Sequence, residues 1–147
     1  MDQLDRFKNK VVFFVELMRI APAKQVEQWL SEQDGASIYI TAITEAELRF
    51  GVAILPTGKR QNYLANLVEG ILEEDFHDRI LPFDRKAAFA FASIAAERRS
   101  VGRPVSQSDG QIAAIARSLS ASVATRNTAD YEGCGVELLN PWLVGLQ

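Results

Sequence analysis

Short apolar runs with strand character alternate with segments of helical periodicity, and this alternation constrains the fold more than any other feature of the chain. The expected strands cover 11–15, 37–41, 79–83, 121–125 and 136–139. The expected helices cover 23–33, 45–55, 59–74, 85–100 and 109–119. Strands separated by helices pair in parallel, because each helix carries the chain back across the sheet. The pattern therefore predicts an α/β fold, a three-layer domain whose mainly parallel central sheet of four to five strands is flanked by helices.

The size and composition fit a single domain over residues 1–147, with 48% hydrophobic and 24% charged residues. A net charge of −3 gives no global attraction for nucleic acid, so any such binding must be local. The lone Cys134 cannot form an intramolecular disulfide, which favours a reducing cytoplasmic setting. No apolar run approaches the roughly 20 residues of a membrane span, and the N-terminus lacks the pattern of a signal peptide.

Polar and acidic residues follow the expected strands, where ligands of parallel α/β sheets bind. Glu47 and Asp109 stand at the starts of two helices, and Arg126, Asn127 and Asp130 follow the 121–125 strand. Carboxylate and amide oxygens gathered at one sheet edge suit Mg²⁺ or Mn²⁺, which need few protein ligands and keep several waters. Arg126 directly after a strand is well placed to contact a phosphate. The sequence thus predicts a hard-metal site at this edge.

Helix capping is the competing interpretation of the same acids. Thr44-x-x-Glu47 and Ser106-x-x-Asp109 both have the form of a capping box. Asp84 likewise needs no role beyond an N-cap. Arg98 and Arg99, in the last turns of a helix, suit either the helix dipole or a phosphate. Only the expected convergence of Glu47 and Asp109 favours the metal interpretation.

Other catalytic chemistries find little support in the sequence. His77 is the single histidine, which excludes a two-histidine acid–base ribonuclease, and its polar surroundings indicate a surface residue. Cys134 lies between two glycines, far along the chain from His77, and is interpreted as an incidental thiol. There is no zinc-binding Cys/His spacing, no Walker loop and no G-x-G-x-x-G.

A set of motifs spread from residue 16 onward carries a more specific signal. The segments are ELMRIAP (16–22), YITAITEAELRFGVAIL (39–55), RILPFD (79–84), SDGQIAAIA (108–116), SVATRNTADY (122–131) and NPW (140–142). With them the chain resembles the PIN-domain family, specifically VapC-type and FitB-like toxins of type II toxin–antitoxin systems. Members of this family are metal-dependent ribonucleases with a PIN-like α/β fold.

The resemblance implies an endoribonuclease that uses Mg²⁺ or Mn²⁺ to cleave RNA phosphodiesters. It implies catalytic roles for Glu47, Asp109 and Asn127, and metal ligation by Glu47, Asp109 and Asp130. It also implies a homodimer held inactive by a small antitoxin that carries a DNA-binding domain.

The N-terminus departs from the family pattern, in which an apolar strand ends in L-D-T-N. Counting back without gaps from Glu16 puts Lys10 at the aspartate, and Asp5 could serve only by a different path. A lysine there would repel a divalent cation. A second hypothesis is therefore a weakened or inactive PIN-like module kept for dimerisation and antitoxin binding. A nuclease acting on single-stranded or flap DNA would share the same acidic residues.

Overall fold

A parallel sheet forms the centre of the protein, seen here in a computed structural model that describes residues 10–13 and 24–143. The described strands are β1 (Val11–Phe13), β2 (Ile38–Thr41), β3 (Ile80–Leu81), β4 (Ser122–Ala124) and β5 (Leu138–Leu139). Their order in the sheet is β3-β2-β1-β4-β5, and every neighbouring pair is parallel. The predicted α/β fold and its five-strand sheet are confirmed, with strands shorter than the apolar runs; residues 14 and 15 lie outside the described part.

The helices also follow the predicted order. They are α2 (Lys24–Glu32), α3 (Ala42–Ala53), α4 (Lys59–Glu69), α5 (Arg85–Ser100) and α6 (Gln107–Ser118). Short turns η2 (Gly35–Ser37) and η4 (Thr128–Tyr131) are 3-10 helical. Among the described residues, no helix is both long and apolar enough to cross a membrane.

The predicted helix over 59–74 divides into two parts. After α4 the chain widens into a π-helical segment, η3 (Gly70–Asp75). There the N–H of Phe76 donates to the carbonyl of Ile71, five residues earlier, at 2.9 Å. Leu72 is buried in this segment and Phe76 packs against the same cluster. The helical periodicity of the sequence does not distinguish this wider turn from an α-helix.

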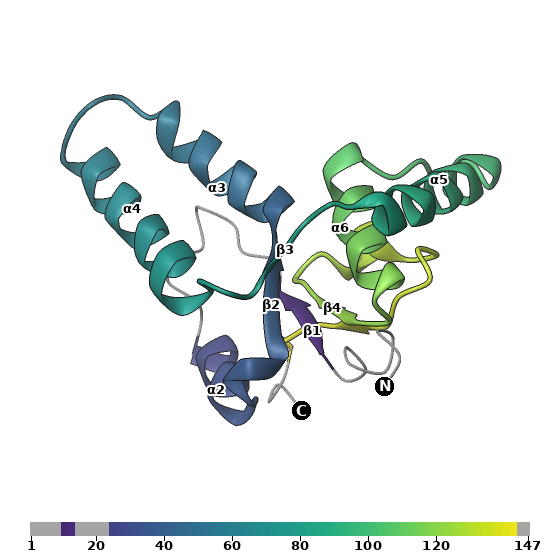
Figure 1. Ribbon diagram of the computed structural model, residues 1–147, viewed down its shortest axis with the longest axis horizontal. Coiled ribbons are helices and arrows are strands. Elements are labelled where there is room, and N and C mark those ends of the chain that lie inside the picture. The colour runs from purple at the N-terminus through teal and green to yellow at the C-terminus, as the bar shows by residue number, and fades with distance from the viewer. Residues whose placement is uncertain (1–9, 14–23, 144–147) are drawn as a thin grey trace.

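Helices cover both faces of the sheet, because successive strand residues point to opposite sides. Val12 and Val123 join the core formed with α5 and α6. Val11, Phe13 and Ile38 face the other way, in a cluster with Trp29 of α2. Figure 1 shows α3 and α4 on one side of the strands and α5 and α6 on the other, which gives the three layers.

The α5 and α6 helices approach each other closely at Gly110, in the first turn of α6. A Cβ added to Gly110 would lie 2.9 Å from Cε2 of Phe91 and 3.0 Å from Cγ1 of Val105. The Phe91 ring is itself packed edge-on against Phe83, with ring centroids 6.2 Å apart. The absence of a side chain at Gly110 thus permits this close packing at the start of α6, where Asp109 lies.

A buried arginine joins the end of α5 to the segment that follows β4. Arg98 is 7% exposed, and its Nε donates to the carbonyl of Arg103 at 2.6 Å. Its Nη1 donates to the carbonyls of Asp130 and Glu132 at 3.2 and 2.6 Å, and to Sγ of Cys134 at 3.5 Å. A buried charge requires such partners, since without them the loss of hydration is uncompensated. We call Arg98 with these acceptors the Arg98 clamp.

Replacement of Gly110 by alanine is expected to destabilise the fold by about 1–3 kcal/mol, because the added methyl group overpacks the α5–α6 contact. Urea unfolding measures the change. Gly70→Ala is the matched control: Gly70 has helical backbone angles, and a Cβ there meets nothing within 4 Å. Equal effects of the two substitutions would contradict the close approach at Gly110.

Arg98→Lys is expected to lower the free energy of unfolding by about 2–4 kcal/mol, because one ammonium group cannot replace the planar fork that reaches several carbonyls. The exposed neighbour provides the control: Arg99→Lys should change stability by less than about 0.5 kcal/mol. Chemical denaturation of both variants tests this, and an Arg98→Lys protein as stable as Arg99→Lys would refute the clamp.

Candidate active site

Glu47 projects from α3, which begins directly after β2. The N-cap of this helix is Thr41, whose Oγ1 accepts a hydrogen bond from the N–H of Thr44 at 3.1 Å. The predicted capping box of Thr44 and Glu47 is therefore wrong. The helix begins at Ala42, and the buried hydroxyl of Thr41 at the end of β2 is its N-cap. Glu47 lies in the second turn with an exposed side chain, so capping does not explain its presence.

Asp109 lies in the first turn of α6, on the other side of the sheet. The predicted cap at Ser106 is confirmed, because its Oγ accepts a hydrogen bond from the N–H of Asp109 at 3.2 Å. The carboxylate of Asp109 has a different partner. Its Oδ1 accepts a hydrogen bond from the hydroxyl of Tyr131 at 3.0 Å. The Asp109 side chain is thus directed toward the segment that follows β4. Asp84 is likewise confirmed as an N-cap, accepting from the N–H of Ala87 at 3.0 Å.

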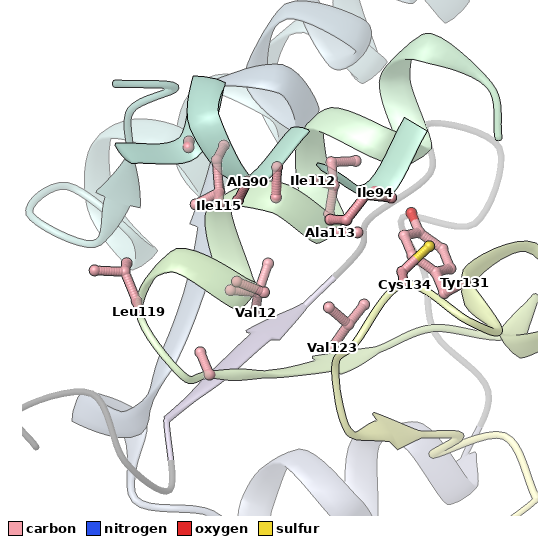
Figure 2. Close-up of a cluster of buried hydrophobic side chains, with 14 of the residues drawn as sticks. Val12, Ala90, Ile94, Ile112, Ala113, Ile115, Leu119, Val123, Tyr131 and Cys134 are labelled. Carbon is pink, nitrogen blue, oxygen red and sulfur yellow. The ribbon is translucent and has the colours of Figure 1, made fainter. Parts of the chain in front are cut away.

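Tyr131 brings the acidic residues of three elements into one electrostatic neighbourhood. Its ring is 2% exposed and belongs to the core cluster, beside Cys134 in Figure 2. Burial raises the pKa of the Tyr131 hydroxyl far above its ordinary value of 10, as do the charge of Asp109 and the hydrogen bond to it. The negative charges of Glu47 and Asp130 raise this pKa further. The charges of carboxylates from α3, α6 and η4 therefore all act on one buried phenol, and the Asp109 carboxylate is hydrogen-bonded to it.

The segment after β4 supplies the remaining polar groups. Thr125 is buried, and its Oγ1 accepts a hydrogen bond from the N–H of Asn127 at 3.1 Å. The carbonyl of Arg126 accepts from Nδ2 of Asn140 at 3.3 Å. The side chains of Arg126, Asn127 and Asp130 are exposed. The backbone of this segment is therefore anchored while its polar side chains face solvent.

The oxygen donors of Glu47 and Asp109 are chemically suited to Mg²⁺ or Mn²⁺. Within residues 10–13 and 24–143, no group of three or more His, Cys, Asp or Glu side chains lies close enough to hold a metal ion. Mg²⁺ is nevertheless commonly bound through one or two carboxylates, with waters and substrate phosphates completing its shell. The described donors therefore fit a hydrated Mg²⁺ or Mn²⁺ and do not form a closed protein cage.

Lys10 does not lie at the carboxyl end of the first strand, where the gapless count from Glu16 would place the aspartate of the family pattern. Its carbonyl accepts a hydrogen bond from the N–H of Ser122 at 3.0 Å, and Val11 pairs with Ile38 and Ser122. Lys10 therefore precedes β1, about 10 Å from the carboxyl end of the strand at about 3.3 Å per residue. The expectation that Lys10 repels a metal ion at the carboxyl edge of the sheet is therefore wrong, because Lys10 lies at the amino edge. Asp5 and Glu16 lie outside the described residues.

Two residues important to this arrangement are not evident as site residues in the sequence. The sequence leaves a phosphate contact open for Arg98, and the burial of this side chain in the Arg98 clamp excludes that role. The sequence does contain a signal for the burial of Arg98. This residue continues the helical spacing of the buried residues of α5, which are Ala87, Ala90, Ile94 and Arg98. Tyr131 has no comparable local signal, since its partner Asp109 is distant in the chain.

The other polar candidates behave as structural or surface groups. His77 is exposed, as predicted. Cys134 is buried, and burial is the main cause that raises the pKa of its thiol, opposing the effect of Arg98. A buried thiol with a raised pKa is a poor nucleophile, since the thiolate is the reactive form.

Known proteins resemble this chain in both sequence and structure. The PIN domain family model matches residues 13–132. VapC ribonuclease Y4jK of Sinorhizobium fredii and Toxin FitB of Neisseria gonorrhoeae are each 39% identical over 127 residues, covering 86% of this chain and 91% of each relative.

Solved structures also resemble this chain. The structure of FitAB bound to an IR36 DNA fragment superposes with a TM-score of 0.81 at 34% identity, covering 90% of this chain and 95% of that one. VapBC-5 from Mycobacterium tuberculosis superposes with a TM-score of 0.70 at 26% identity, covering 88% of this chain and 98% of that one. From its matched length, its fold and these relatives, the chain belongs to the PIN domain family, and its relatives there include VapC- and FitB-type toxins.

Proposed function

We propose that this protein is a Mg²⁺- or Mn²⁺-dependent endoribonuclease toxin that is neutralised by a cognate antitoxin. The observation that carries the proposal is that Asp109 is hydrogen-bonded to the Tyr131 hydroxyl, while the charges of Glu47 and Asp130, on two other elements, act on the same hydroxyl. A divalent cation would offset the repulsion among carboxylates that act on one electrostatic neighbourhood. The similarity to a VapC ribonuclease supports RNA as the substrate.

In this proposal each side chain has a stated task. Glu47 and Asp109 hold the cation, and Asp130 adds negative charge at the edge of the site. The chemistry that such an ion supplies when bound is activation of water and neutralisation of charge on a phosphodiester. Asn127 orients substrate or water through its amide, and Arg126 contacts a phosphate oxygen through its exposed guanidinium.

The structural relatives support the proposed partners. FitAB was solved on a DNA fragment and VapBC-5 is a member of a toxin–antitoxin family. By analogy, this protein binds a small antitoxin that carries a DNA-binding domain, and it forms a homodimer. The antitoxin would suppress nuclease activity in the complex.

A second candidate function is a PIN-like binding module without strong catalysis. The observation that favours it is that, in the part of the chain that the structure describes, no group of three or more His, Cys, Asp or Glu side chains lies close enough to hold a metal ion. Fewer carboxylates hold a divalent cation less tightly. In this alternative the fold is retained for dimerisation and antitoxin binding.

Glu47→Gln and Asp109→Asn are each expected to reduce Mn²⁺-dependent RNA cleavage by about 100-fold or more, because each removes a charge that stabilises the reacting phosphate and its cation. Cleavage of a structured RNA by the purified protein is the assay. Glu45→Gln is the matched control on the same helix, since Glu45 pairs with Arg49 at 2.8 Å, and it should leave the rate within about twofold.

The cleavage assay, together with antitoxin binding and Mn²⁺ calorimetry, separates the two candidate functions. Cleavage by the wild-type protein that both site substitutions abolish supports the nuclease. An inactive wild-type protein that still binds its antitoxin, with no Mn²⁺ binding in calorimetry, supports the binding module. Cleavage that survives Asp109→Asn would exclude the proposed site.

Lys10→Met is expected to leave Mn²⁺ affinity unchanged within about twofold, because Lys10 lies at the amino edge of the sheet and its charge is screened over that distance. Isothermal titration with Mn²⁺ measures this. A large gain in affinity would show that the lysine does oppose the cation, contrary to its position before β1.

A further inference from the structure

We propose that Tyr131 is a positioning residue for Asp109: its hydroxyl holds one carboxylate oxygen and leaves the other directed to the cation. The inference deepens the proposed function and rests on it for the role of Asp109. Nothing in the similarity to the PIN family assigns this role to Tyr131. The evidence is the 3.0 Å hydrogen bond from the Tyr131 hydroxyl to Oδ1 of Asp109.

Asp109 is fixed at two points. Its N–H donates to Oγ of Ser106 at 3.2 Å, and its carboxylate accepts from Tyr131. An aspartate in the first turn of a helix would otherwise sample several staggered rotamers. With the carboxylate held by Tyr131, one rotamer is favoured, and the oxygen that accepts no bond from Tyr131 is the more available of the two to a ligand.

The donor is itself rigid. The Tyr131 ring is 2% exposed within the core cluster. The carbonyls on either side of it, those of Asp130 and Glu132, accept hydrogen bonds from Arg98 in the Arg98 clamp. The hydroxyl therefore reaches Asp109 from a fixed backbone, and the orientation costs little additional entropy when a cation binds.

The hydroxyl remains a donor under all ordinary conditions. An unperturbed phenol has a pKa of about 10, so the hydroxyl is protonated at neutral pH and can donate to Asp109. A permanent donor beside a metal-binding carboxylate fixes which oxygen faces the metal, as outer partners of metal ligands commonly do. Loss of such a partner typically weakens metal binding about 10-fold to 100-fold.

The test is Tyr131→Phe, which removes the hydroxyl and keeps the ring. Tyr63→Phe is the matched control, since Tyr63 is 64% exposed on α4. The first measurement needs no metal: three-bond coupling constants from NMR report the χ1 rotamer of Asp109. We expect one rotamer in the wild type and in Tyr63→Phe, and rotamer averaging in Tyr131→Phe.

The second measurement is Mn²⁺ affinity by calorimetry, where Tyr131→Phe should raise the Kd about 10-fold and Tyr63→Phe should not. In an Asp109→Asn background, Tyr131→Phe should have no further effect on affinity, because the hydroxyl acts through that carboxylate. Additive losses would indicate a general structural effect and would overturn the proposal.

The outcomes separate the positioning role from the nuclease function. If Asp109 keeps a single rotamer in Tyr131→Phe, the positioning role is refuted, whether or not the protein cleaves RNA. If the rotamer averages while the wild type binds no Mn²⁺, the positioning of Asp109 stands and the metal-dependent function fails.

Discussion

The parallel pairing of β1 with both β2 and β4 is the constraint on which the rest of the structure depends. Val11 lies level with Ile38 on one side and Ser122 on the other. This register brings the carboxyl ends of the central strands to one edge of the sheet. The helix after β2 then carries Glu47, and the segment after β4 carries Tyr131 and Asp130. The placement of the candidate site residues therefore follows from strand register before any side-chain contact is considered.

The alternation of strands and helices was sufficient to predict the layers and the parallel sheet, because apolar periodicity reflects which side of each element is buried. The start of α3 was predicted less well. Thr41 and Thr44 both satisfy the sequence preference for a helix N-cap, and only the end of β2 decides between them. The π-helical turn was missed because its pattern of apolar residues is compatible with an α-helix.

The position of Lys10 shows a limit of a different kind. The gapless count from Glu16 assumes that no residues are inserted or deleted relative to the family pattern. The backbone hydrogen bonds of β1 show directly which residues form the strand. The bond between Lys10 and Ser122 places the lysine at the amino edge. The partners of Tyr131 and Arg98 cannot be predicted for a related reason, although helical spacing in α5 does indicate that Arg98 is buried. Their roles arise from contacts between distant segments, and a single sequence carries no direct record of such contacts.

The strand order also has a consequence for synthesis of the chain. The central strand β1 precedes its neighbour β4 by more than 100 residues, so β1 is synthesised well before β4. Glu47 is therefore translated well before the sheet can close and before Asp109 and Tyr131 can meet. Non-local pairings of this kind form late, after most of the chain is available. A chain truncated before residue 122 would carry Glu47 and Asp109 without the strand and phenol that bring them together.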